Sequence, residues 1–130
     1  MRAKTKGNRY QKTIRDFLQR NYVDILNKEI PVNEYWIEET YGKDTPERPA
    51  DLIIKMRGKE NSWDFDFLFI ECKHVKRATR AMKQQWWEHL NRINGIIIYR
   101  ENRRDDRVIF NKYLCETYLD EWIKMRLKDI

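Results

Sequence analysis

The chain has 130 residues, of which 41% are hydrophobic, 13% aromatic and 37% charged, and its formal net charge is +6. A chain of this length can bury one core, so we expect residues 1–130 to form a single domain that needs neither disulfides nor a structural metal. The interleaving of charged and apolar residues excludes an extended disordered chain. No apolar run suits a signal peptide or a membrane span. The positive charge favours a polyanionic partner such as nucleic acid, although an anionic membrane surface would meet the same requirement.

The spacing of the cysteines and histidines argues against a zinc site. The chain has 2 cysteines, Cys72 and Cys115, which form no CxxC pair, and 2 histidines, His74 and His89. A tetrahedral zinc site needs four such ligands at regular spacing. Reduced thiols are typical of a cytoplasmic protein, which is the location we expect.

The predicted elements alternate between helical and strand periodicity along the chain. In chain order they are a helix over 8–23, a strand over 34–40, a loop over 42–49, a strand over 50–56, a turn over 57–61, a strand over 65–73, a helix over 79–93, strands over 96–99 and 107–110, and an amphipathic helix over 112–127. The order α-β-β-β-α-β-β-α predicts an α/β fold with a mixed β-sheet flanked by helices. The helix over 79–93 would be a right-handed crossover between parallel strands.

Three polar residues on two neighbouring strands carry the candidate chemistry. Glu71 and Lys73 share one face of the strand over residues 65–73, and both are costly to bury without a partner or a function. Asp51 opens the preceding strand, and a hairpin between the two strands would bring its carboxylate to Glu71. Two close carboxylates repel each other, and a divalent cation relieves that repulsion by accepting oxygens from both.

Mg²⁺ or Mn²⁺ suits such a site. Asp51 and Glu71 would provide carboxylates and Cys72 a backbone carbonyl, with water and substrate phosphate completing the shell. Lys73 would orient or deprotonate the attacking water, or stabilise the scissile phosphate. These residues therefore predict a metal-dependent phosphodiester hydrolase, and the structural alternative is a surface ion pair between Glu71 and Lys73.

These motifs resemble a known nuclease signature. Pro49-Ala50-Asp51, followed after twenty residues by Glu71-Cys72-Lys73, resembles the PD-(D/E)xK nuclease superfamily, with an alanine inserted before the aspartate. Over residues 6–100 the chain is most similar to archaeal-type and phage Holliday-junction resolvases and to small VRR-NUC-like nucleases. The resemblance implies a restriction-endonuclease-like core, Mg²⁺ or Mn²⁺ on the acidic pair, and cleavage of branched or structured DNA by a homodimer.

The resemblance also concerns three glutamines. It implies a glutamine on the crossover helix, and both Gln84 and Gln85 stay open for this role. The first helix of the resolvases usually bears a Glu where this chain places Gln11, which carries no charge. This departure leaves a non-catalytic DNA- or RNA-binding protein with a degraded site as the rival interpretation. Cleavage of linear duplex or flap DNA is a further alternative.

A basic run leads away from the proposed site and predicts contacts with DNA phosphates. It lies beside the predicted start of the helix over 79–93, where a bound anion would be stabilised. Its members are His74, Lys76, Arg77, Arg80 and Lys83. The alternative is a solvated helix end. In a second basic stretch, over residues 100–107, acidic residues dilute the arginines, so phosphate contact and a solvated loop both stay open there.

Overall fold

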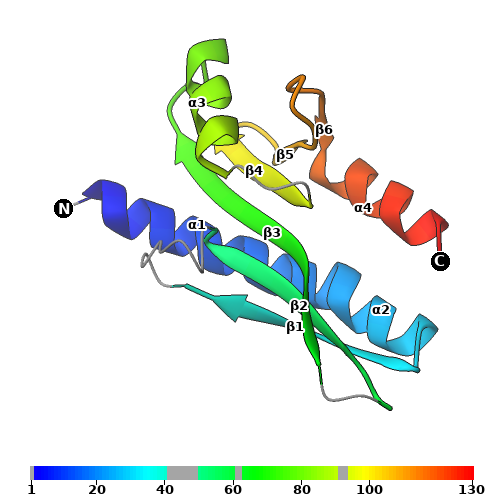
Figure 1. Cartoon of the computed structure of the whole chain (residues 1–130). Coiled ribbons are helices and arrows are strands. Elements are labelled where there is room, and N and C mark those ends of the chain that lie inside the picture. The colour runs from blue at the N-terminus through cyan, green and yellow to red at the C-terminus, as the bar shows by residue number, and fades with distance from the viewer. Residues whose placement is uncertain (1, 41–49, 61–62, 91–93) are drawn as a thin grey trace.

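The structure is a computed structural model that describes residues 2–40, 50–60, 63–90 and 94–130, with side chains from residue 8 onward. Within these ranges the chain forms an α/β fold in which helices cover a mixed sheet of six strands (Figure 1). The elements are α1 (Arg2–Leu18), a π-helical segment η1 (Gln19–Val23), α2 (Asp24–Glu29), β1 (Asn33–Glu39), β2 (Leu52–Gly58), β3 (Asp64–Val75), α3 (Arg80–Leu90), β4 (Gly95–Glu101), β5 (Arg107–Ile109), β6 (Glu116–Tyr118) and α4 (Leu119–Lys128).

The strands follow one another in the sheet in the order β1-β2-β3-β4-β5-β6. β3 and β4 are parallel, and every other neighbouring pair is antiparallel. α3 lies between the two parallel strands in the chain, and both strands point toward the α3 end of the molecule (Figure 1). The predicted α/β class, the mixed sheet and the helix between parallel strands are therefore confirmed.

The two faces of the sheet bury separate apolar clusters. Ile54 and Ile70 belong to a cluster with residues of α1 and α4, whereas Ile53 and Phe69 belong to a cluster with residues of α3. Neighbouring strand residues point to opposite faces, so α1 and α4 cover one face and α3 the other. This two-sided burial explains the continuous apolar runs of β3 and β4.

Side-chain bonds to the backbone start one helix and join another helix to the sheet. The Thr79 hydroxyl accepts the backbone N–H of Met82 at 3.2 Å, which is the bond of a helix N-cap, so α3 starts at the next residue. The Asn27 side chain on α2 bonds the backbone of Tyr35 in both directions, at 2.7 and 3.0 Å. This pair of bonds ties α2 to β1.

The first helical region is longer than the predicted 8–23. It begins at Arg2 and continues through η1 and α2 to Glu29 (Figure 1). The prediction ended too early because Leu26, on the last turn, is also buried and extends the apolar face. No helix in the described part of the chain is both long and apolar enough to cross a membrane.

The predicted helix over 112–127 is wrong in its first turns, because the chain forms β6 before α4 begins. Asn111 Oδ1 accepts the backbone N–H groups of Tyr113 and Cys115 at 3.0 and 3.3 Å, and Leu114 adopts a φ of 61°. A left-handed residue and a side chain that captures backbone donors both prevent a helix from starting. The chain turns back instead and pairs with β5.

Three predictions lie wholly or partly outside the described residues, one of them being the turn over 57–61 at its last residue. The other two are the whole loop over 42–49, which includes Pro49 of the motif, and the end of the helix at 91–93.

Candidate active site

Asp51 directly precedes β2, and donors from two other elements hold its main chain. The backbone N–H and the hydroxyl of Thr40, which follows β1, lie 3.0 and 3.3 Å from the Asp51 carbonyl oxygen. Gln11 Nε2 on α1 donates to the same oxygen at 3.5 Å, and the Gln11 side chain is buried. These contacts fix the position from which the Asp51 carboxylate projects.

The Asp51 carboxylate is anchored on β3. Its Oδ2 atom accepts the backbone N–H of Cys72 at 2.8 Å, a short bond that the charge of the acceptor strengthens. The register pairs Leu52 with Ile70, so Asp51 and Glu71 are the next residues in line on the two strands. The sequence predicted a hairpin that aligns Asp51 with Glu71, and the observed register of β2 and β3 has this alignment.

Glu71 and Lys73 form an ion pair at the end of β3. Lys73 Nζ lies 3.3 Å from Glu71 Oε2, and the exposed fractions of the two side chains are 33% and 2%. A buried carboxylate needs such a partner, because removing it from water costs several kcal/mol. The ion pair considered from the sequence is therefore present, but its acid is buried rather than at the surface.

The Cys72 thiol belongs to the other face of the sheet and packs in the core against α1. Burial raises the pKa of this thiol well above its usual value, and the negative charges of Asp51 and Glu71 raise it further. The thiol is thus held protonated and is a poor nucleophile.

The donor set suits a small divalent cation. Among the described residues there is no group of three or more His, Cys, Asp or Glu side chains that could hold a metal ion. Mg²⁺ does not require such a group, because it takes one or two carboxylates and fills its shell with water, carbonyl and phosphate oxygens. Asp51, Glu71 and the Cys72 carbonyl fit that requirement by donor type.

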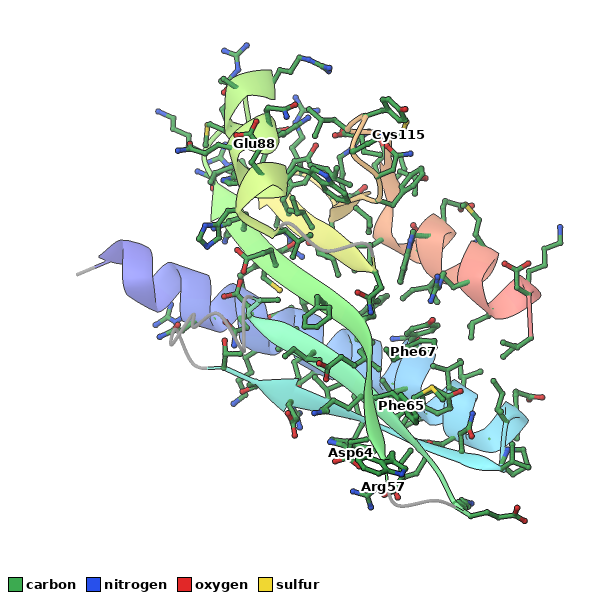
Figure 2. All side chains as sticks on the ribbon, in the orientation of Figure 1. Arg57, Asp64, Phe65, Phe67, Glu88 and Cys115 are labelled. Atoms are coloured by element: carbon green, nitrogen blue, oxygen red, sulfur yellow. The ribbon has the colours of Figure 1, made fainter. Side chains whose placement is uncertain are left out.

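The two candidate glutamines lie on α3. Gln84 and Gln85 are exposed, and Gln84 Nε2 donates to Glu88 Oε1 at 3.2 Å. Glu88 extends from α3, as Figure 2 shows. The bond of Gln84 stays within α3 and does not favour it over Gln85, so the choice between them stays open.

The predicted phosphate contacts fall into two groups. Lys76, Arg77 and Arg80 are exposed on the segment between β3 and the first turn of α3. Lys83 instead lies against the sheet, with its Nζ atom 3.0 Å from Glu116 Oε2 and 5.0 Å from the centroid of the Tyr99 ring. The sequence predicted a phosphate contact for Lys83, and in the structure its ammonium is paired with a carboxylate from β6.

His74 also packs inward, with its ring centroid 5.3 Å from that of Tyr10. The Tyr10 hydroxyl donates to Asp106 Oδ1 at 2.8 Å, and Arg100 binds both oxygens of Asp106, at 2.8 and 3.1 Å. Burial, followed by the charge of Asp106, raises the pKa of Tyr10 far above its usual value. In the sequence, Asp106 is visible only as an acid that dilutes a basic stretch, because no pattern of neighbouring residues connects it with a tyrosine 96 residues away.

Comparisons of the chain with protein-family models, with curated proteins and with solved structures found no match. A function for this chain is therefore inferred from the geometry of Asp51, Glu71 and Lys73 and from the motif that they form.

Proposed function

We propose that the protein is a metal-dependent endodeoxyribonuclease with a restriction-endonuclease-like core, acting on branched or structured DNA such as Holliday junctions. One observation carries the proposal. The 2.8 Å bond from the Cys72 N–H to Asp51 Oδ2 holds one carboxylate against the segment that bears the buried Glu71 and its partner Lys73. Asp51, just before β2, is thus bonded to the backbone of the strand that carries the second acid and the amine.

Asp51 and Glu71 would hold the cation, together with the Cys72 carbonyl. Mg²⁺ or Mn²⁺ supplies neutralisation of the negative charge that develops on the phosphate during hydrolysis. In the reaction a water oxygen bonds to phosphorus, the bond from phosphorus to the leaving oxygen breaks, and the proton of the water ends on that oxygen.

Lys73 has the role that its partner allows. An ammonium paired with Glu71 at 3.3 Å has no lone pair to take a proton. We therefore assign it to orienting the attacking water and to stabilising the scissile phosphate, not to proton abstraction. With 33% of its side chain exposed, Lys73 is reachable by a substrate, whereas Glu71 is screened from bulk water.

The substrate assignment rests on the motif and on charge. Lys76, Arg77 and Arg80 are exposed immediately beyond Lys73, where they can contact DNA phosphates on either side of the cut. Paired cuts in a symmetric junction need two sites, so we propose a homodimer, which sedimentation would detect. Linear duplex and flap DNA are the alternative substrates.

The test compares labelled four-way junction, flap and linear duplex in Mg²⁺, Mn²⁺ and EDTA. Asp51→Asn, Glu71→Gln and Lys73→Ala should each lower the metal-dependent cleavage rate by about 100-fold or more while DNA binding is retained. Asp120→Asn and Lys124→Ala, which change exposed charges on α4, are matched controls and should stay within about twofold of wild type. Unchanged cutting by both Glu71→Gln and Lys73→Ala would refute the site.

A non-catalytic nucleic-acid-binding protein is the second candidate, and one observation favours it. Gln11 is buried at a helix position where the resolvases usually have a Glu, and its amide binds the Asp51 carbonyl instead of adding a charge. DNA binding without cleavage in any divalent metal would support this candidate over the nuclease.

A further inference from the structure

A basic pocket lies beyond the carboxyl end of β4, outside the candidate active site. Its volume is about 290 Å³, which is room for a phosphate and part of a sugar. It is lined by Glu101, Arg103, Arg104, Asp105, Arg107 and Tyr118. The pocket belongs to the second basic stretch, for which the sequence left phosphate contact and a solvated loop equally open.

One arginine of the pocket is held in place from two sides. Arg107 Nε lies 2.9 Å from Glu116 Oε1, and its guanidinium carbon lies 4.9 Å from the centroid of the Tyr118 ring. The Tyr99 hydroxyl donates to the same Glu116 oxygen at 2.8 Å, which fixes the carboxylate in turn. A guanidinium positioned before its ligand arrives loses less side-chain entropy on binding.

The other two arginines are exposed at the turn between β4 and β5. Within the described part of the chain, neither Arg103 nor Arg104 forms an ion pair, unlike Arg107. The Arg104 N–H donates to the Glu101 carbonyl at 3.1 Å and closes the turn, in which Arg103 adopts a φ of 62°. Glycine adopts such a φ more readily, so the turn geometry gives no reason for a long cationic side chain there.

The turn is joined to the segment that follows the candidate active site. The parallel register pairs His74 with Arg100 and Val75 with Glu101, so β3 and β4 end side by side. Glu101 Oε2 then accepts the backbone N–H of Ala78 at 2.9 Å. This bond engages one of the two carboxylates of the pocket and holds the β3–α3 segment against the β4–β5 turn. Ligands of α/β proteins commonly bind at this edge of a sheet.

We propose that this pocket binds a backbone phosphate of DNA and that, with Lys76 and Arg77, it forms a phosphate-binding edge leading away from Lys73. The choice of DNA as ligand rests on the proposed function. On the other side of Tyr118 a second pocket is lined by acidic residues, among them Asp120 and Glu121. Those carboxylates repel phosphate, so the edge ends at Tyr118.

The test measures DNA binding in EDTA, where metal-dependent cleavage is absent. The pocket variant combines Arg103→Gly with Arg104→Ala, and the control combines Lys124→Ala with Lys128→Ala, which removes two positive charges from exposed positions on α4. Fluorescence anisotropy with a labelled duplex of about 20 base pairs would follow affinity across a series of salt concentrations. The melting temperature of the pocket variant should not fall, because glycine accepts the φ of residue 103.

The pocket variant should bind DNA about tenfold more weakly than wild type. The slope of its log affinity against log salt concentration should be smaller in magnitude by about 1 to 2. The control should stay within about twofold of wild type. Equal weakening of both variants, unchanged binding by the pocket variant, or no binding by wild type would overturn the proposal. A protein that cuts DNA but binds without the pocket refutes the pocket alone. Pocket-dependent binding by a protein that never cuts refutes the nuclease alone.

Discussion

The hydrogen bond between Asp51 and the backbone of Cys72 allows the role of the aspartate as a hydrogen-bond acceptor to be tested separately from the role of its charge. Asp51→Asn keeps an oxygen that can accept the Cys72 N–H, whereas Asp51→Ala leaves that donor without its 2.8 Å acceptor. Both substitutions remove the negative charge beside Glu71. The pair of variants therefore distinguishes an anchor for the strand from a ligand for a cation.

The expected magnitudes follow from the bond. A hydrogen bond to a charged acceptor contributes about 1.5 to 3 kcal/mol, and a neutral one about 1 kcal/mol. Asp51→Ala should therefore cost about 2 to 3 kcal/mol, and Asp51→Asn about 1 kcal/mol. The entropy of unfolding for 130 residues makes 1 kcal/mol equal to about 4 °C in melting temperature. We expect decreases of about 10 °C for alanine and about 4 °C for asparagine.

Thermal melts followed by circular dichroism, with and without Mg²⁺, would measure both effects. A cation that binds only the folded wild type at about ten times its Kd adds about 1.4 kcal/mol, or about 5 °C, and this increase should vanish in both variants. Equal melting temperatures for Asp51→Ala and Asp51→Asn would refute the anchoring role. An undiminished response of both variants to Mg²⁺ would refute the role of Asp51 as a ligand.

Three further predictions concern buried titratable groups. Lys73→Met should lower the free energy of unfolding, measured with urea, by about 3 kcal/mol, because it removes the ammonium paired with the buried Glu71 carboxylate. Adding Glu71→Gln should restore part of this loss. A Lys73→Met variant as stable as wild type would contradict the pairing. A thiol reagent at about pH 8 should label the exposed Cys115, which precedes β6 (Figure 2). The reagent should label Cys72 only after unfolding, because burial shields that thiol and raises its pKa. Burial also raises the pKa of Tyr10, so its phenol contributes fully to stability below pH 10, and this contribution falls above pH 10 by about 1.4 kcal/mol per pH unit. The stability of Tyr10→Phe should lack this part of the decline at high pH. Identical stability-against-pH profiles for the variant and wild type would contradict the assignment.

Short-range patterns predicted where Asp51, Glu71 and Lys73 lie on the hairpin. Alternation along one strand put Glu71 and Lys73 on the same face, and the turn near Gly58 indicated the hairpin that aligns Asp51 with them. The apolar runs and the helix between them predicted the parallel pair β3 and β4. These features depend on residues close together in the chain, and their periodicity is visible without coordinates.

Contacts between distant segments could not be predicted in the same way. The sequence predicted that Lys83 contacts phosphate, but its ammonium pairs with Glu116 of β6. This strand was not predicted, because its residues fall within the segment predicted to be helical. The sequence showed Gln11 only as an uncharged residue where resolvases usually have a Glu, but its side chain binds the main chain of Asp51 across a separation of 40 residues. Periodicity predicts the face of a helix or strand on which a side chain lies. The residue that it contacts on that face depends on how the whole chain packs. The amino-acid order thus specified the chemistry available at the strand ends, and the folded sheet selected which of those groups meet.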